Sequence, residues 1–341
     1  MFSLSQGFLI NLLVLGTLNC SAVESARGQQ RPPVVRHGDK VVISPDATDA
    51  DLAVLSTMRG VKIISFEGGP NKRRSHITDD GLGNFEGLSE LEVLRLPEAN
   101  ITDAGVAHLK QLTQLRELWL DFNRQITDAG LRDLSALKKL RVLRFYGAPV
   151  TDTGLYYIKA LTELEDLQLG RAEVTDAGLS YVSGFTKLKT LDFQGTRITD
   201  SGLVHLSGLK NLDWLCLQNT NITSAGLAHL ENLTNLTWLI LDFTAIDDDG
   251  LAHLAQMSRL NTLYLTSTLV TDAGLGHLKD LSNLERLKLN LTEITDAGLL
   301  SLASLSKLNY LELFGTGTTP GGIKTLQRAL PKLEVIVIRN F

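Results

Sequence analysis

Five of the seven histidines occupy the same position in a recurring sequence pattern. Each lies two residues after the end of a hexamer similar to Ile-Thr-Asp-Ala-Gly-Leu, and the five are His108, His205, His229, His253 and His277. Imidazole is a common metal ligand, but the ligand nitrogens must all lie about 2.0–2.1 Å from one ion. One imidazole per repeated helix, with helices about 10 Å across, forms a row that does not converge. We therefore expect these histidines to pack on helix surfaces, with no bound metal and no cofactor.

The sequence contains none of the short patterns that carry a catalytic mechanism. Gly-x-Ser-x-Gly, a phosphate-binding glycine loop, His-Glu-x-x-His and Cys-x-x-Cys are all missing. The plentiful aspartates of the hexamers are explained as helix starts. We predict that the protein is not an enzyme.

Charge and cysteine content argue against nucleic-acid binding and against a fold held by internal disulfides. The net charge is −5 and the isoelectric point about 5.8, and Lys and Arg do not cluster, so we expect no nucleic-acid partner. The two cysteines are Cys20 and Cys216. If the first leaves with a leader peptide, no internal disulfide can form.

The hexamer repeats along most of the chain. It begins at Ile77, Ile101, Ile126, Val150, Val174, Ile198, Ile222, Ile246, Val270 and Ile294, with a looser copy at Ala47 and a worn copy at Thr318. The spacing between the ten clear copies is 24 residues except for one step of 25, from Ile101 to Ile126. A fixed period in the twenties is typical of a stacked-repeat protein of about twelve units.

Each unit combines two periodicities. In the copy that starts at Val270, leucines three residues apart indicate one helical face, and leucines two residues apart indicate a strand with one inward face. Thr271 and Asp272 suit the start of the helix, and Gly274 suits close packing against the neighbouring unit. We predict an α/β fold, a curved solenoid with parallel strands on the concave face and the wider helices on the convex face.

The pattern L-x-x-L-x-L-x-x-[T/N], joined to I-T-D-A-G-L, resembles the leucine-rich-repeat family. It is most similar to the ITDxGL class shared by F-box-type receptors and bacterial secreted repeat proteins, and the resemblance covers residues 47–341. It implies protein binding on the concave face. The cysteines and the F-box-like helical bundle of the receptors are missing, so a substrate-recognition subunit of a ubiquitin ligase stays an alternative.

Three regions are expected. Residues 1–22 form a predicted signal peptide, with an apolar run from Phe8 to Leu18 that is too short to span a bilayer. Residues 23–46 are a polar linker and residues 47–341 the solenoid. We expect a secreted, periplasmic or cell-surface protein. Because no Lys or Arg precedes the apolar run, a cytoplasmic chain with a retained N-terminus is the alternative, and lipidation of Cys20 is another.

The outward residues of the strands indicate where a partner binds. Trp214 and Trp238 fall in the same column of adjacent strands, so their rings should stack or nearly touch. We predict that they form an aromatic patch with Ile240, Phe243 and Tyr264, which either binds a partner or shields the strand backbone from water. The full predicted binding set is Trp119, Tyr146, Trp214, Trp238, Ile240, Asp242, Phe243, Tyr264, Arg286, Lys288, Tyr310 and Phe314.

The partner is expected to be a protein. Carbohydrate also stacks on tryptophan, so a glycan is a second option, and a structural surface protein is a third. In the columns where related repeats carry an asparagine ladder, six threonines follow one another and are expected to satisfy turn backbone groups. They are Thr196, Thr220, Thr244, Thr268, Thr292 and Thr316.

Overall fold

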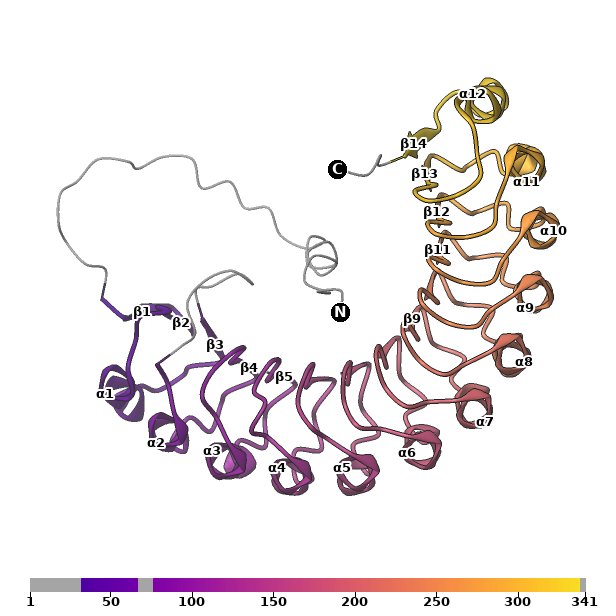
Figure 1. Ribbon diagram of the computed structural model, residues 1–341. Helices are drawn as coiled ribbons and strands as arrows, with labels where there is room; N and C mark the ends of the chain where they lie inside the picture. Colours follow the sequence, from indigo (N-terminus) through magenta and orange to yellow (C-terminus); the bar gives the residue numbers. More distant parts are fainter. Residues whose placement is uncertain (1–31, 67–75, 338–341) are drawn as a thin grey trace, which may run out of the picture. The chain divides into compact units, whose positions relative to one another are not determined.

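The computed structural model describes residues 32–66 and 76–337 (Figure 1). The chain divides into two units, Met1–Pro32 and Pro33–Phe341, and the described helices and strands all belong to the second. The predicted signal peptide, residues 1–22, lies outside the described residues. Among the described helices, none is long and apolar enough to cross a membrane.

The described strands form a single sheet in which each strand pairs with its neighbours in sequence. β1 and β2 are antiparallel, and every later pair is parallel. The strands are β1 (Val34–His37), β2 (Lys40–Ile43), β3 (Ile63–Phe66), β4 (Val93–Arg95), β5 (Glu117–Trp119), β6 (Val142–Arg144), β7 (Asp166–Gln168), β8 (Thr190–Asp192), β9 (Trp214–Cys216), β10 (Trp238–Ile240), β11 (Thr262–Tyr264), β12 (Arg286–Lys288), β13 (Tyr310–Glu312) and β14 (Glu334–Ile336).

A short helix follows each strand from β2 to β13, and several helices continue as a 3₁₀ turn. Leucines three residues apart suit that turn, because it has three residues per turn. The helices are α1 (Asp49–Leu52), α2 (Asp79–Leu82), α3 (Asp103–Ala107), α4 (Asp128–Leu134), α5 (Asp152–Ile158), α6 (Asp176–Val182), α7 (Asp200–Leu203), α8 (Ser224–Leu227), α9 (Asp248–Ala252), α10 (Asp272–Leu275), α11 (Asp296–Leu299) and α12 (Pro320–Ala329).

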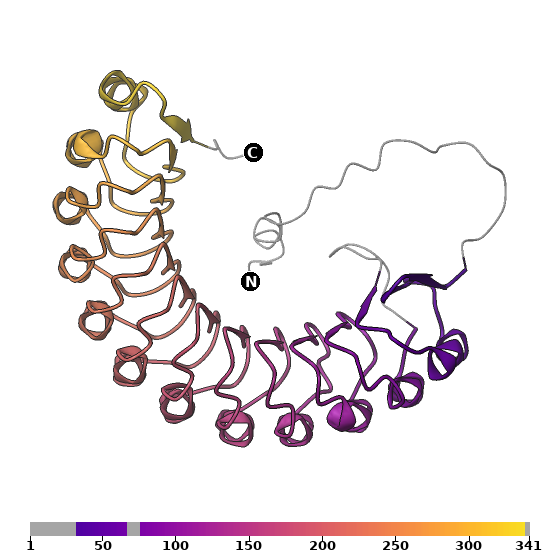
Figure 2. The same ribbon diagram turned by 180° about the vertical axis from the view of Figure 1, so that it is seen from behind.

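The repeats stack into a curve with the strands on the inner side and the helices on the outer side (Figures 1 and 2). Strands in register lie about 4.8 Å apart, whereas helices are about 10 Å across, so the helical side must be longer. Equivalent leucines face each other through the stack, as Leu215, Leu239 and Leu263 do, and all three are fully buried. The predicted curved solenoid is confirmed.

The N-terminal boundary differs from the sequence-based expectation. Residues 34–43, assigned above to a linker, form the hairpin β1–β2, and β2 pairs in parallel with β3. The hairpin forms because β-branched residues flank the turn at Gly38, which has a φ of 66°. Val41 and Ile43 are fully buried, so β2 is the strand of one more repeat and β1 covers its edge.

The hexamer aspartates do more than begin helices. In α10, Thr271 caps the helix, and its N–H and hydroxyl both donate to Asp248 of the preceding repeat, at 2.8 and 2.6 Å. The same pair of bonds recurs from Asp49 through to Asp296, with one exception. An Asp–Thr ladder therefore links neighbouring repeats along the helical side.

The ladder also explains the glycine of the hexamer. A Cβ at Gly274 would lie 2.3 Å from Oδ1 of Asp248 and 3.1 Å from its Cα. Since the second contact is with backbone, a side chain at this position would require the neighbouring repeat itself to shift. The predicted close-packing role is confirmed, and the group that it approaches is the aspartate of the preceding repeat.

At the exception to the ladder, the hydroxyl and the carboxylate have exchanged repeats. Ser224 stands where other repeats have Asp, and Asp247 stands where the next repeat has Thr. The Ser224 hydroxyl donates to Oδ1 of Asp247 at 2.5 Å, and the Asp247 N–H donates to the Ser224 oxygen at 2.9 Å. Both partners are exchanged, so the link between repeats is kept.

The threonine column behaves as predicted. Each of the six hydroxyls donates to the backbone carbonyl three residues earlier, at 2.5–2.8 Å. These bonds close the turn that follows each strand, and the structural role of the column is confirmed.

Candidate functional site

The repeated histidines lie on separate helical turns. Nδ1 of His108 is 2.6 Å from a carboxylate oxygen of Glu86, and Nδ1 of His253 is 2.5 Å from one of Glu231. Within residues 32–66 and 76–337, no group of three His, Cys, Asp or Glu side chains could hold a metal ion. Two of the five repeated histidines, His108 and His253, thus pair with a glutamate of the preceding repeat.

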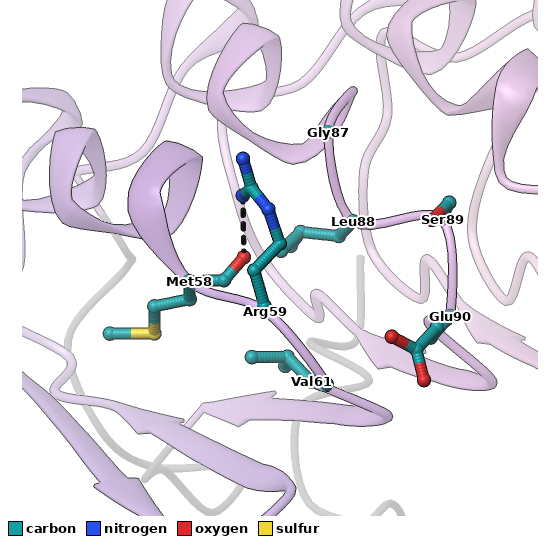
Figure 3. Close-up of a pocket in the computed structure, with 8 residues that line it drawn as sticks. Met58, Arg59, Val61, Gly87, Leu88, Ser89 and Glu90 are labelled. Carbon is teal, nitrogen blue, oxygen red and sulfur yellow. Dashed lines mark hydrogen bonds between the residues drawn. The ribbon is translucent and has the colours of Figure 1, made fainter.

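A small cavity lies near the N-terminal end of the described residues. A cavity of about 20 Å³ lies between the first two helical turns, lined by Met58, Arg59, Val61, Leu88, Glu90 and neighbouring residues (Figure 3). Arg59 donates to the carbonyl of Met58 there, at 2.9 Å. This volume holds about one water molecule, so it offers no site for a substrate.

The centre of the concave sheet carries a compact aromatic cluster. Cys216, Ile240 and Tyr264 form a buried group, and Trp214 and Trp238 pack against it. Ile240 is 1% and Tyr264 6% exposed, whereas the two tryptophans are half-buried. We expected a surface patch of aromatic side chains; in the structure, the two tryptophans pack against a small second core.

The tryptophans occupy matching positions but do not make the ring contact that their column suggested. Trp214 and Trp238 are register partners in β9 and β10. The ring contact recorded for Trp238 is with Tyr264, at 6.0 Å between centroids and an interplanar angle of 50°. The rings lean along the strand direction as well as standing off the sheet, so a diagonal neighbour replaces the directly opposite one.

Phe243 lies apart from this cluster. It occupies the turn after β10 with a φ of 58° and is 45% exposed. There it borders an open surface depression shared with Thr220, Asn221, Ile222, Thr244, Ala245, Ser267 and Leu269. Because a left-handed residue turns the chain away from the strand, the side chain leaves the concave wall, and grouping it with Tyr264 was wrong.

Trp119 forms a second aromatic site towards the N-terminal end. The guanidinium carbon of Arg95 lies 4.3 Å from the Trp119 ring centroid, and that of Arg144 lies 4.1 Å from it. The two arginines therefore cover both faces of one ring. Arg95 also pairs with Glu117 and Arg144 with Asp166.

Tyr146 lies beside this second site. Its ring occupies the space above Gly170, where a Cβ would be 2.5 Å from the ring. Phe122 contacts it with 5.1 Å between ring centroids, and the guanidinium of Arg171 lies 5.8 Å from its centroid. Burial raises the pKa of Tyr146 to about 12.

The predicted residues at the C-terminal end lie together. Arg286 lies 4.0 Å from the Tyr310 ring centroid, and Lys288 lies 4.3 Å from that of Tyr264. Lys288 also pairs with Glu312 at 3.1 Å. Phe314, the last residue of the set, is half-buried.

Three aspartates of the concave face are unusually buried for carboxylates. They are Asp121, Asp192 and Asp242, and burial raises the pKa of each to about 6. Asp121 and Asp242 accept the N–H of a residue in the next repeat, Tyr146 at 2.9 Å and Thr266 at 2.6 Å. Asp242 was predicted as a binding residue, whereas the shared environment of the three was missed, because column position does not reveal burial.

Comparison with known proteins agrees with this architecture. A family model described as a leucine-rich repeat matches residues 186–207 and 280–303. The solved structure of an internalin, InlF from Listeria monocytogenes, is similar with a TM-score of 0.70 and 23% identity over 89% of this chain and 87% of that chain. A second, internalin C2 of the same organism, gives a TM-score of 0.48 and 25% identity over 62% of this chain and 84% of that chain.

Among curated proteins, none matches the chain. The likeness to InlF is one of fold, and the residues that line the concave face must be interpreted from their own chemistry.

Proposed function

We propose that this chain, a leucine-rich-repeat protein, is a non-enzymatic scaffold that binds a protein partner through its concave sheet. The observation that carries the proposal is the pair of half-buried tryptophans, Trp214 and Trp238, held over the buried cluster of Cys216, Ile240 and Tyr264. Rigid, partly exposed aromatic residues near the centre of a surface are typical of binding hot spots.

The charged side chains around the tryptophans favour a protein as the partner, rather than a polymer that carries charge of one sign. Arg95, Arg144 and Lys288 each pair with a carboxylate on the same face. A face of paired charges around an apolar centre resembles the polar rim and apolar core of protein interfaces.

Ile240 and Tyr264 are buried, which indicates that these two side chains shield the strand backbone from water. The two tryptophans retain exposed surface that shielding alone does not use. We therefore place the contact on Trp214 and Trp238 and assign Ile240 and Tyr264 to their support.

We also propose that the protein acts outside the cytoplasm, on the basis of the leader-like residues 1–22. Intact mass of the chain from its native host, together with fractionation, tests this. A mature chain that begins near Val23 supports export, and a full-length cytosolic chain contradicts it.

The binding proposal is tested by site-specific photocrosslinking in the host. A crosslinking residue at Gln194 or Gln218, both half-buried on the concave face, should capture a discrete protein, and one at Tyr156, which is 46% exposed on α5, should not. Trp214→Ala with Trp238→Ala should abolish the capture.

The double variant exposes the buried cluster of Cys216, Ile240 and Tyr264. A second variant that obstructs the concave face without removing packing is therefore needed. With the crosslinking residue at Gln194, Gln218→Tyr adds bulk to the face and removes no packing, so it should also prevent capture while circular dichroism and the melting temperature stay unchanged. Capture that survives both variants would contradict binding through this face.

A further inference from the structure

Basic side chains of the concave face lie between an aromatic ring and a carboxylate. Arg95 covers one face of Trp119, at 4.3 Å, while its Nη2 donates to Glu117 at 2.9 Å. Arg144 covers the other face of the same ring and pairs with Asp166. Each guanidinium thus has a π face on one side and a negative charge on the other.

The C-terminal end repeats the arrangement with an ammonium group. Lys288 lies 4.3 Å from the ring centroid of Tyr264 and 3.1 Å from a carboxylate oxygen of Glu312. In two separate regions of the face, a basic side chain therefore contacts both an aromatic ring and a carboxylate.

The four central strands, β8 to β11, contribute rings and carboxylates to the concave face but no basic side chain of their own. From β8 to β11, the residues that face the concave side include no Lys or Arg: they are Thr190, Asp192, Gln194, Trp214, Cys216, Gln218, Trp238, Ile240, Asp242, Thr262, Tyr264 and Thr266. Within the described part of the chain, a basic side chain lies over each other Trp and Tyr ring of this face, namely Trp119, Tyr146, Tyr264 and Tyr310. No described Lys or Arg lies over Trp214 or Trp238.

Asp192 of β8 lies on the strand next to Trp214. It pairs with Cys216 in register, so it is the diagonal neighbour of Trp214. Its Oδ1 accepts from the N–H of Gln194 at 2.8 Å. Its Oδ2 lies 3.3 Å from the point where Gly170 would carry a Cβ, next to the Tyr146 ring that fills that space.

We infer that the partner supplies the missing cation: an arginine side chain that stacks on Trp214 and Trp238 and pairs with Asp192. This inference rests on the proposed function and names the chemistry of the partner at that site. The occupant is a segment of a partner protein that carries the arginine, and charge complementarity selects it.

The electrostatic environment of Asp192 favours a cation. Its pKa is raised to about 6, mainly by burial; the nearby Asp121 and Asp166 also raise it, while the N–H of Gln194 and the thiol of Cys216 lower it. Asp166 is compensated by Arg144, whereas none of these groups brings a positive charge to Asp192. A guanidinium would supply it at a site where little water competes.

The test is a titration followed by the indole N–H signals of the three tryptophans in NMR spectra of the full chain. The probe is a soluble peptide with four Gly-Arg repeats, and its control has citrulline, the neutral isostere, in place of each arginine. Trp119 is an internal reference because both faces of its ring are already covered. We expect the Trp214 and Trp238 signals to shift saturably with the arginine peptide, with at least about tenfold weaker binding of the citrulline peptide.

Asp192→Asn should weaken binding of the arginine peptide about fivefold or more. Lowering the pH from 7.5 to 5 should weaken it in the wild type, because Asp192 becomes protonated, and have a smaller effect in Asp192→Asn. The inference is overturned if the two signals do not move, or if they move equally with citrulline. If crosslinking captures a partner but the arginine peptide does not bind, the proposed binding through the concave face is supported. In that case only the inference that the partner supplies an arginine is contradicted.

Discussion

Asp192 shows how one side chain can report on the whole concave face. It is 6% exposed, and burial raises its pKa from 3.8 to about 6. The folded protein therefore binds more protons than the unfolded chain between about pH 4 and pH 6. The stability that this group contributes is complete below the unfolded pKa and is lost as the pH rises through the folded one.

We predict that Asp192→Asn raises the free energy of unfolding at pH 7.5 by on the order of 2 kcal/mol and changes it little at pH 4. Asparagine keeps the shape of the protonated acid and carries no charge at either pH. Denaturant unfolding at the two pH values measures the effect, with the exposed Asp280→Asn as control. An equal effect at both pH values would show that the fold does not raise the pKa of Asp192.

At the scale of the elements, the Asp–Thr ladder links each short helix to the next. A helix of four residues such as α7 is too short to be stable alone, so bonds between units must hold it. Asp176 accepts both the N–H and the hydroxyl of Thr199, and the cap of each helix is thereby tied to its neighbour. The exchanged pair Ser224 and Asp247 shows that the link tolerates reversal when both residues change.

We predict strong non-additivity at that pair. Ser224→Asp alone places a second carboxylate against Asp247, and Asp247→Thr alone leaves two hydroxyls, so each should lower the free energy of unfolding. The double variant restores the arrangement of the other repeats and should recover most of the loss, with an interaction energy of about 1–3 kcal/mol. A double-mutant cycle by denaturant unfolding checks this, and simple additivity would contradict the ladder.

At the scale of the whole solenoid, the repeats form one continuous core that has open ends. Stability in such an array is carried by contacts between nearest neighbours, so the first strand matters more than its length suggests. Val41 of β2, within the hairpin, is fully buried, while its neighbour Val42 is half-buried.

We predict that Val41→Ser loosens the N-terminal repeats and leaves the C-terminal ones intact. Amide hydrogen exchange should accelerate in β3 and β4 and stay unchanged in β11 to β13, because local opening spreads through adjacent units. Val42→Ser, of the same chemistry at the half-buried neighbouring position, is the matched control. Acceleration along the entire sheet would instead indicate a single cooperative unit.

Periodicity alone was enough to derive the curved solenoid, the position of each helix from α1 to α12, the role of the threonine column and the tight packing at Gly274. These features repeat, and each copy needs only its local sequence and an identical neighbour. The hairpin at residues 34–43 was missed because it occurs once and carries no period.

The binding face depended on tertiary structure. A column position says that a side chain leaves the concave side of a strand, but its burial and partners depend on the side chains of two neighbouring strands. Ile240 is therefore buried under Trp238, Trp119 is enclosed by two arginines, and Phe243 leaves the wall at a left-handed turn. Every other described Trp and Tyr ring of that face has a basic side chain over it, except that of Trp238, and only this comparison showed that Trp214 has none.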